Sequence, residues 1–155
     1  MKLRKTIKII TWASFGIYCI LILLTFFRTR TNFADLSIAD YWKRANFIPF
    51  KTIINYLSNL VHDSINFRII FSNLFGNLIV FLPMGFFLPI LFLKSRTFLK
   101  TNLIIFVFVM LVEVVEAVFR IGVFDIDDIM LNILGAMIGY TISRVPLLIT
   151  KGKNA

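Results

Sequence analysis

Three aspartates directly precede an apolar stretch in the C-terminal third of the chain, in the sequence DIDDIMLNILGAMIGY (125–140). Two glutamates lie three residues apart just before them, so one helix face would carry both. Carboxylate oxygens suit hard divalent cations, and such a cation could contact a substrate phosphate. The D-x-D-D spacing does not match a known cation loop, so we expect no resident metal. The carboxylates concerned are Asp125, Asp127, Asp128, Glu113 and Glu116.

Amide side chains recur at helical spacing around these acids. Asn73 and Asn77 are four residues apart, and Asn132 follows Asp128 by four. A charged group near the bilayer centre costs about 2.5–3.5 kcal/mol on insertion scales, so polar residues within a span usually face the bundle interior and mark function. We therefore predict that the three asparagines and the five carboxylates line one ligand pocket.

Arg120 allows a purely structural alternative for these acids. It follows Glu116 by four residues and Glu113 by seven, on the same helical stripe, so ion pairs could hold them. Arg68 is a second possible partner. Two arginines against five acids leave negative charge uncompensated, unless a carboxyl is protonated or a cation binds. This surplus favours a functional pocket, with Arg120 among its residues. If a cation does bind, Asp125, Asp127 and Asp128 are its candidate ligands.

Catalysis by a nucleophile finds little support. The single histidine, His62, falls in a predicted loop, and neither G-x-S-x-G nor H-E-x-x-H occurs. The single cysteine, Cys19, excludes an intrachain disulfide and a paired-cysteine zinc site. Whether the chain is an enzyme stays open, and the balance favours a protein without catalytic activity.

The composition places all these residues in a membrane protein. The chain has 155 residues, of which 59% are hydrophobic and 16% charged, and its mean hydropathy is +0.87. Such a chain has too little polar surface for a water-soluble particle. Four apolar segments are long enough to cross a bilayer. We predict an all-α polytopic bundle of one domain, 1–155, with spans near 9–27, 70–93, 98–119 and 126–143.

Prolines and glycines predict how the spans meet. Pro83, with Gly85 two residues on, should kink or break the second span near Leu82, because proline lacks the helical N–H. Gly135 and Gly139 form G-x-x-x-G, which lets helices approach closely in lipid. They continue the polar stripe of Asp128 and Asn132, so the stretch should act as a helix-contact seam. Pro83, Gly85, Gly135 and Gly139 are the predicted packing residues.

The first loop is more than a linker. KTIINYLSNLV (51–61) places apolar residues at helical spacing opposite Asn55, Ser58 and Asn59. This pattern fits a helix lying in the membrane interface, or equally one packed on the bundle. Tyr41 and Trp42, just upstream, have the amphipathic rings favoured at headgroup depth.

Alternation of the spans brings the polar residues together. The start of the second span, the end of the third and the start of the fourth must lie on one side of the membrane. The conspicuous polar residues occupy these three places, and the long first loop lies on the same side.

Three blocks resemble the VanZ-like family, which takes its name from a teicoplanin-resistance protein. They are NFIPF (46–50), NLIVFLPMGFFLP (77–89) and EVVEAVFRIGVFDIDDIMLNILGAMIGY (113–140), and the resemblance covers about 46–145. The family commonly has Gln where Glu116 stands, which changes the charge of the pocket. The resemblance implies a bacterial cytoplasmic-membrane protein, with some members linked to low-level resistance to lipidated glycopeptides.

Two functions compete on this basis. The leading hypothesis is binding of a lipid-linked envelope precursor, or of antibiotic near it, in an outward-facing acidic pocket. The alternative is a metal-assisted enzyme acting on a lipid phosphate or diphosphate. A small transporter subunit is disfavoured, because the acids are confined to one leaflet. Nucleic-acid binding is not expected, because the basic residues flank the spans in small groups.

The basic clusters predict that both termini are cytoplasmic. Lysine and arginine accumulate near cytoplasmic span ends, and roughly ten of them belong to that side in this arrangement. Reporter fusions after residues 60, 97, 123 and 155 should therefore read outside, inside, outside and inside. An outside reading after residue 97 would refute this topology.

Overall fold

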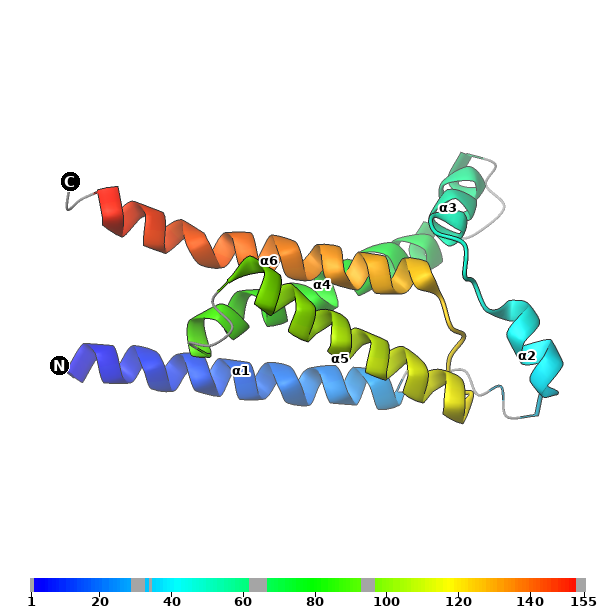
Figure 1. The fold of residues 1–155 in the computed structure, drawn as a ribbon, viewed down its shortest axis with the longest axis horizontal. Helices are drawn as coiled ribbons and strands as arrows, with labels where there is room; N and C mark the ends of the chain where they lie inside the picture. Colours follow the sequence, from blue (N-terminus) through cyan, green and yellow to red (C-terminus); the bar gives the residue numbers. More distant parts are fainter. Residues whose placement is uncertain (1, 29–32, 34, 62–66, 93–96, 153–155) are drawn as a thin grey trace.

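The computed structural model describes every residue except 1, 29–32, 34, 62–66, 93–96 and 153–155. The described chain is helical, and its only β-type pairing is one isolated bridge. Figure 1 shows the helices, which are α1 (Lys2–Arg28), α2 (Ile38–Arg44), α3 (Lys51–Val61), α4 (Phe67–Leu91), α5 (Phe98–Phe119) and α6 (Ile126–Gly152). The predicted all-α class is confirmed.

Four of the described helices are long and apolar enough to cross a membrane, as predicted. Their qualifying segments are Lys5–Leu24, Phe67–Leu91, Phe98–Phe119 and Ile126–Arg144. The first turns of α1 and the last turns of α6 lie at one end of the bundle, whereas α2 and α3 lie at the other (Figure 1). The start of α4, the end of α5 and the start of α6 share that second end.

Helices α4 and α6 make the closest contact in the bundle. A Cβ added to Gly135 or Gly139 would overlap the carbonyl oxygen of Leu78 or Leu82, and one added to Gly85 would overlap that of Ala136. The two backbones therefore touch directly through small residues. Burial from water provides no drive for association in lipid, so this close packing is what holds the pair together. Gly85, Gly135 and Gly139 all belong to this contact, which we call the glycine seam.

Of the kink or break expected near Leu82, the break does not occur: α4 is helical from Phe67 through Pro83 and Pro89 to Leu91. Pro83 supplies no N–H for the carbonyl of the preceding turn. The hydroxyl of Tyr18 in α1 donates to the Val80 carbonyl of that turn at 2.8 Å. The carbonyl that loses its donor is that of Ile79, one residue earlier, so the Tyr18 bond fastens α1 to the proline-containing turn of α4 and does not replace the missing N–H.

Helix α1 packs more loosely than the others. Only 6% of its apolar window is buried, against 39% for α6. Ile22 reaches the hydrophobic core, which consists of Ile22, Phe81, Met84, Leu88, Ile105, Val109, Ile129 and Ala136. Most of the remaining surface of α1 is therefore left to lipid.

The glycine seam yields a matched pair of substitutions. Gly135→Ala places a Cβ against the backbone of α4 and should push the helices apart, at a cost of about 1–3 kcal/mol or more. Gly76→Ala lies in α4 with open space around its added Cβ, and should be neutral or stabilising by up to about 1 kcal/mol. Unfolding of both variants in detergent micelles checks this. Equal stability of the two variants would contradict a direct backbone contact.

Candidate functional site

The loop that carries NFIPF is joined to the start of α6 by its main chain. The Asn46 N–H donates to the Phe124 carbonyl at 2.8 Å, and the Ile126 N–H donates to the Asn46 carbonyl at 3.0 Å. These two bonds form the isolated bridge between Asn46 and Asp125. Residues almost eighty positions apart are thereby held side by side at the end of the bundle.

Asp125 caps α6 and ties it to this loop. One carboxylate oxygen accepts from the Asp127 N–H at 2.8 Å, the arrangement of an N-cap aspartate. The same oxygen accepts from the Asn46 side-chain amide at 2.9 Å. The other oxygen accepts from the Thr52 hydroxyl at 2.6 Å. Both oxygens of Asp125 are therefore occupied by protein donors.

Asp127 caps a different helix. Its side chain is fully buried, and it accepts from the main-chain N–H groups of Phe50 at 2.5 Å, Thr52 at 2.7 Å and Ile53 at 3.2 Å. Thr52 and Ile53 belong to the first turn of α3 and Phe50 directly precedes it, where the N–H groups have no partners within the helix. Phe50, the residue before α3, has φ 67° and no polar side chain to act as a cap. A carboxylate from α6 therefore supplies the cap and favourably meets the α3 dipole.

Asp128 lies with the amides of α4. The Asn77 side-chain amide donates to its carboxylate, and the Asn73 amide donates to the Tyr56 hydroxyl of α3 at 2.9 Å. Burial raises the pKa of Tyr56, and the negative charge of Asp128 raises it further. Asp128, Asn77, Asn73 and Tyr56, which we call the α3–α4–α6 polar cluster, therefore adjoin one another.

The two glutamates of α5 are buried, with side chains only 6% and 5% exposed. Burial chiefly raises the pKa of Tyr41 in α2, and the nearby charges of Glu113 and Glu116 raise it further. Tyr41 is almost wholly buried, so its ring faces the protein interior, and its expected place at headgroup depth stays a prediction. The Tyr41 ring meets the ring of its neighbour Trp42 edge-on, with centroids 5.3 Å apart, and Trp42 is exposed.

Arg120 forms hydrogen bonds with backbone groups of the segment that precedes α2. It ends α5 in a left-handed conformation, with φ 52°, and its guanidinium donates to the Leu36 carbonyl at 2.7 Å. Its own carbonyl accepts from the Phe33 N–H at 2.8 Å. These contacts fasten the segment before α2 to the end of α5.

Asn132 lies one turn below Asp128 and is only 7% exposed. Its side-chain oxygen accepts no hydrogen bond within the described part of the chain. His62 falls outside the described residues, so its predicted loop position is not described. Among the residues that are described, no three of His, Cys, Asp or Glu come together as a metal site needs.

The predicted site residues thus lie at one end of the bundle, but their hydrogen-bond partners differ. The sequence predicted that the three aspartates line one ligand pocket, whereas the hydrogen bonds show Asp125 and Asp127 capping helices. Sequence reasoning also missed Asn46, Thr52 and Tyr56 as polar partners. An α3 start without Ser, Thr, Asp or Asn as its cap was the available signal that a distant acceptor was needed.

Comparison with known proteins shows the family of the chain. A sequence model of the VanZ/LLP1 family matches residues 15–149. The chain belongs to the VanZ/LLP1 family. Protein VanZ of Enterococcus faecium is 28% identical over 134 residues, covering 85% of this chain and 72% of that protein. No solved structure matches the chain. The family match begins within α1, earlier than the blocks that carry the resemblance in the sequence, and it contains every residue of the site.

Removing the Asp127 cap should loosen α3. Asp127→Ala leaves three main-chain N–H groups without their acceptor, and an unsatisfied buried donor costs about 1–3 kcal/mol. Hydrogen exchange at the Thr52 and Ile53 amides should therefore accelerate by about 10-fold or more.

Asp40→Ala is the matched control. Asp40 is an exposed carboxylate paired with Lys43 on α2, and surface pairs contribute about 0–1 kcal/mol. The α3 amides should exchange at the parent rate in this variant. Parent-like exchange in Asp127→Ala would show that the carboxylate does not hold α3.

Proposed function

We propose that this membrane protein binds an amphipathic envelope ligand, either a lipid-linked precursor or a lipidated glycopeptide, at the α3–α4–α6 polar cluster. The observation that carries the proposal is the position of Asp128 and its amide partner Asn77 on helices with exposed apolar side chains. Ile54 and Leu57 of α3, and Phe71 and Phe75 of α4, are large hydrophobic side chains left exposed. A ligand with a polar head and an acyl tail would meet both surfaces.

The electrostatics of the cluster favour a ligand head that donates hydrogen bonds. Asp128 brings an acceptor, and Glu113 and Glu116 add buried acidic groups at the same end of the bundle. A phosphate would be repelled by these groups, whereas peptide amides and ammonium groups would be attracted. We therefore place the peptide or glycopeptide part of the ligand at Asp128, and its acyl chain along α3.

The capping aspartates act indirectly in this proposal. Asp125 and Asp127 hold α3 and the NFIPF loop against α6, and α3 carries Tyr56 into the polar cluster. A platform fixed before the ligand arrives loses less conformational entropy on binding. Lysine and arginine accumulate near cytoplasmic span ends, so the basic residues near the opposite bundle end favour a platform on the outer face of the cytoplasmic membrane.

A binding measurement tests the proposal. Purified protein in lipid nanodiscs should bind labelled teicoplanin, and Asp128→Asn should weaken binding by about 10- to 150-fold, since a hydrogen bond to a charged group contributes about 1.5–3 kcal/mol. Expression in a susceptible Gram-positive host should raise the inhibitory concentration of teicoplanin, and the variant should lose this effect at equal membrane abundance.

Asp40→Asn provides the control, because Asp40 is an exposed carboxylate of the same end, outside the polar cluster. It should bind like the parent. Parent-like binding by Asp128→Asn would move the site elsewhere. Failure of the parent to bind either teicoplanin or a lipid-linked precursor would reject the proposed function.

A further inference from the structure

Acidic and basic residues are segregated along this chain. All eight acidic residues fall within 35–63 and 113–128. In the described parts of these ranges, α2, α3, the end of α5 and the start of α6 lie at one end of the bundle. The segments that lead to the opposite end carry only basic charge. Their basic residues are Lys2, Arg4, Lys5, Lys8, Lys94, Arg96, Lys100, Arg144, Lys151 and Lys153. That end therefore has no acidic side chain in its sequence to neutralise its cations.

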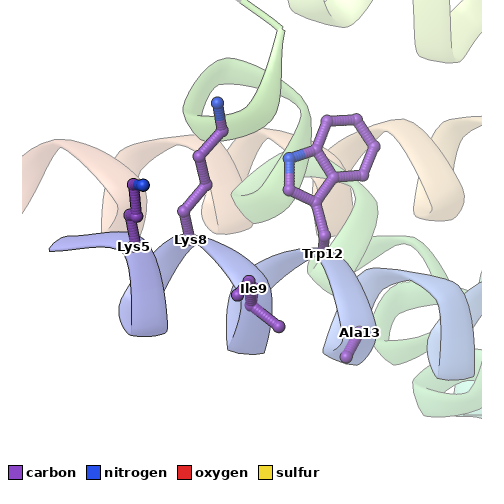
Figure 2. A pocket seen from close by; sticks show the side chains of 5 residues that line it. All are labelled: Lys5, Lys8, Ile9, Trp12 and Ala13. Atoms are coloured by element: carbon purple, nitrogen blue, oxygen red, sulfur yellow. The ribbon is translucent and has the colours of Figure 1, made fainter. Parts of the chain in front are cut away.

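A hollow of about 590 Å³ lies against α1 at this basic end. Its described lining consists of Lys5, Lys8, Ile9, Trp12 and Ala13. Figure 2 shows Lys5, Lys8 and Trp12 on the same side of the helix. Lys5 and Lys8 are separated by three residues and Lys8 and Trp12 by four, so the helical repeat puts the three side chains in one row.

The Trp12 ring is held in place beside the hollow. It meets the Phe92 ring edge-on, with centroids 5.4 Å apart, and the Phe15 ring at 6.4 Å. Tryptophan is enriched at headgroup depth, where its ring is apolar and its N–H can donate. The lining of the hollow thus combines two cations, one aromatic donor and the apolar side chains of Ile9 and Ala13.

We propose that this hollow binds the phosphate headgroup of an anionic phospholipid, with Lys5 and Lys8 on the phosphate and Trp12 beside the upper acyl chain. Two lysines within one turn repel each other, and a shared anion relieves that repulsion. The loose packing of α1 leaves its surface open to lipid. The lining residues precede the family match, which begins at residue 15, so this site is independent of the ligand pocket proposed above.

Fluorescence of Trp12 gives a direct test. The chain has two tryptophans, so Trp42→Phe leaves Trp12 as the reporter. The protein is reconstituted in phosphatidylcholine vesicles containing a minor fraction of acyl-brominated phosphatidylglycerol, and separately with brominated phosphatidylcholine at the same fraction. Quenching by the anionic lipid should exceed quenching by the zwitterionic lipid. Each lysine should contribute about fivefold to this preference, following the roughly 1 kcal/mol per basic residue near anionic lipid.

Substitutions separate a site from diffuse attraction. Lys5→Gln/Lys8→Gln should remove the preference, and Lys5→Arg/Lys8→Arg should retain it. Lys100→Gln is the control for charge alone, because Lys100 is exposed at the start of α5 and does not line the hollow. Equal quenching by both lipids in the Trp42→Phe protein would overturn the proposal, without any further variant. So would an equal loss in Lys100→Gln and in the double variant.

Discussion

The direct contact between α4 and α6 is the constraint on which the rest of the structure depends. Two helices in hydrocarbon gain nothing from leaving water, so they stay together through close packing and polar contacts. The glycine seam supplies the first, with added Cβ atoms excluded at Gly85, Gly135 and Gly139. The close approach of α4 and α6 at this seam also lets the Asn77 side-chain amide donate to the Asp128 carboxylate. Packing and polar pairing therefore support the same register.

This register also places α3. The first turn of α6 projects the Asp127 carboxylate to the N–H groups that begin α3, while Asp125 reaches Thr52 and Asn46. A buried carboxylate with too few donors would be costly, and α3 would begin with unsatisfied N–H groups. The start of α3 supplies the donors that the Asp127 carboxylate needs, and Asp127 supplies the acceptor that these N–H groups need. The apolar surface of α3 is consequently presented on a fixed support next to Asp128, which is the basis of the proposed ligand site.

The two ends of the bundle present different chemistry to the membrane. One end joins acidic side chains and amides to exposed apolar helices, and suits a ligand head rich in hydrogen-bond donors. The charged residues in the segments that lead to the other end are all basic, and Trp12 lies there beside a hollow, so this end suits a phosphate headgroup. Helix α1 connects these ends with few buried side chains, although Tyr18 anchors its middle to the proline-containing turn of α4.

The sequence by itself determined the membrane class, the four spans and the shared end of the polar residues, because these follow from apolar length and from alternation across a bilayer. It also singled out Gly135 and Gly139, whose spacing is local to one helix. Only the tertiary structure decided what each acid contacts. Asp127 meets Thr52 across 75 positions, and no local periodicity encodes a partner so distant. Tertiary structure also decided the contact at Pro83. Local chemistry predicted a kink or break near Leu82, but α4 stays helical through Pro83, and Tyr18 of α1 donates to the carbonyl of Val80 in the preceding turn.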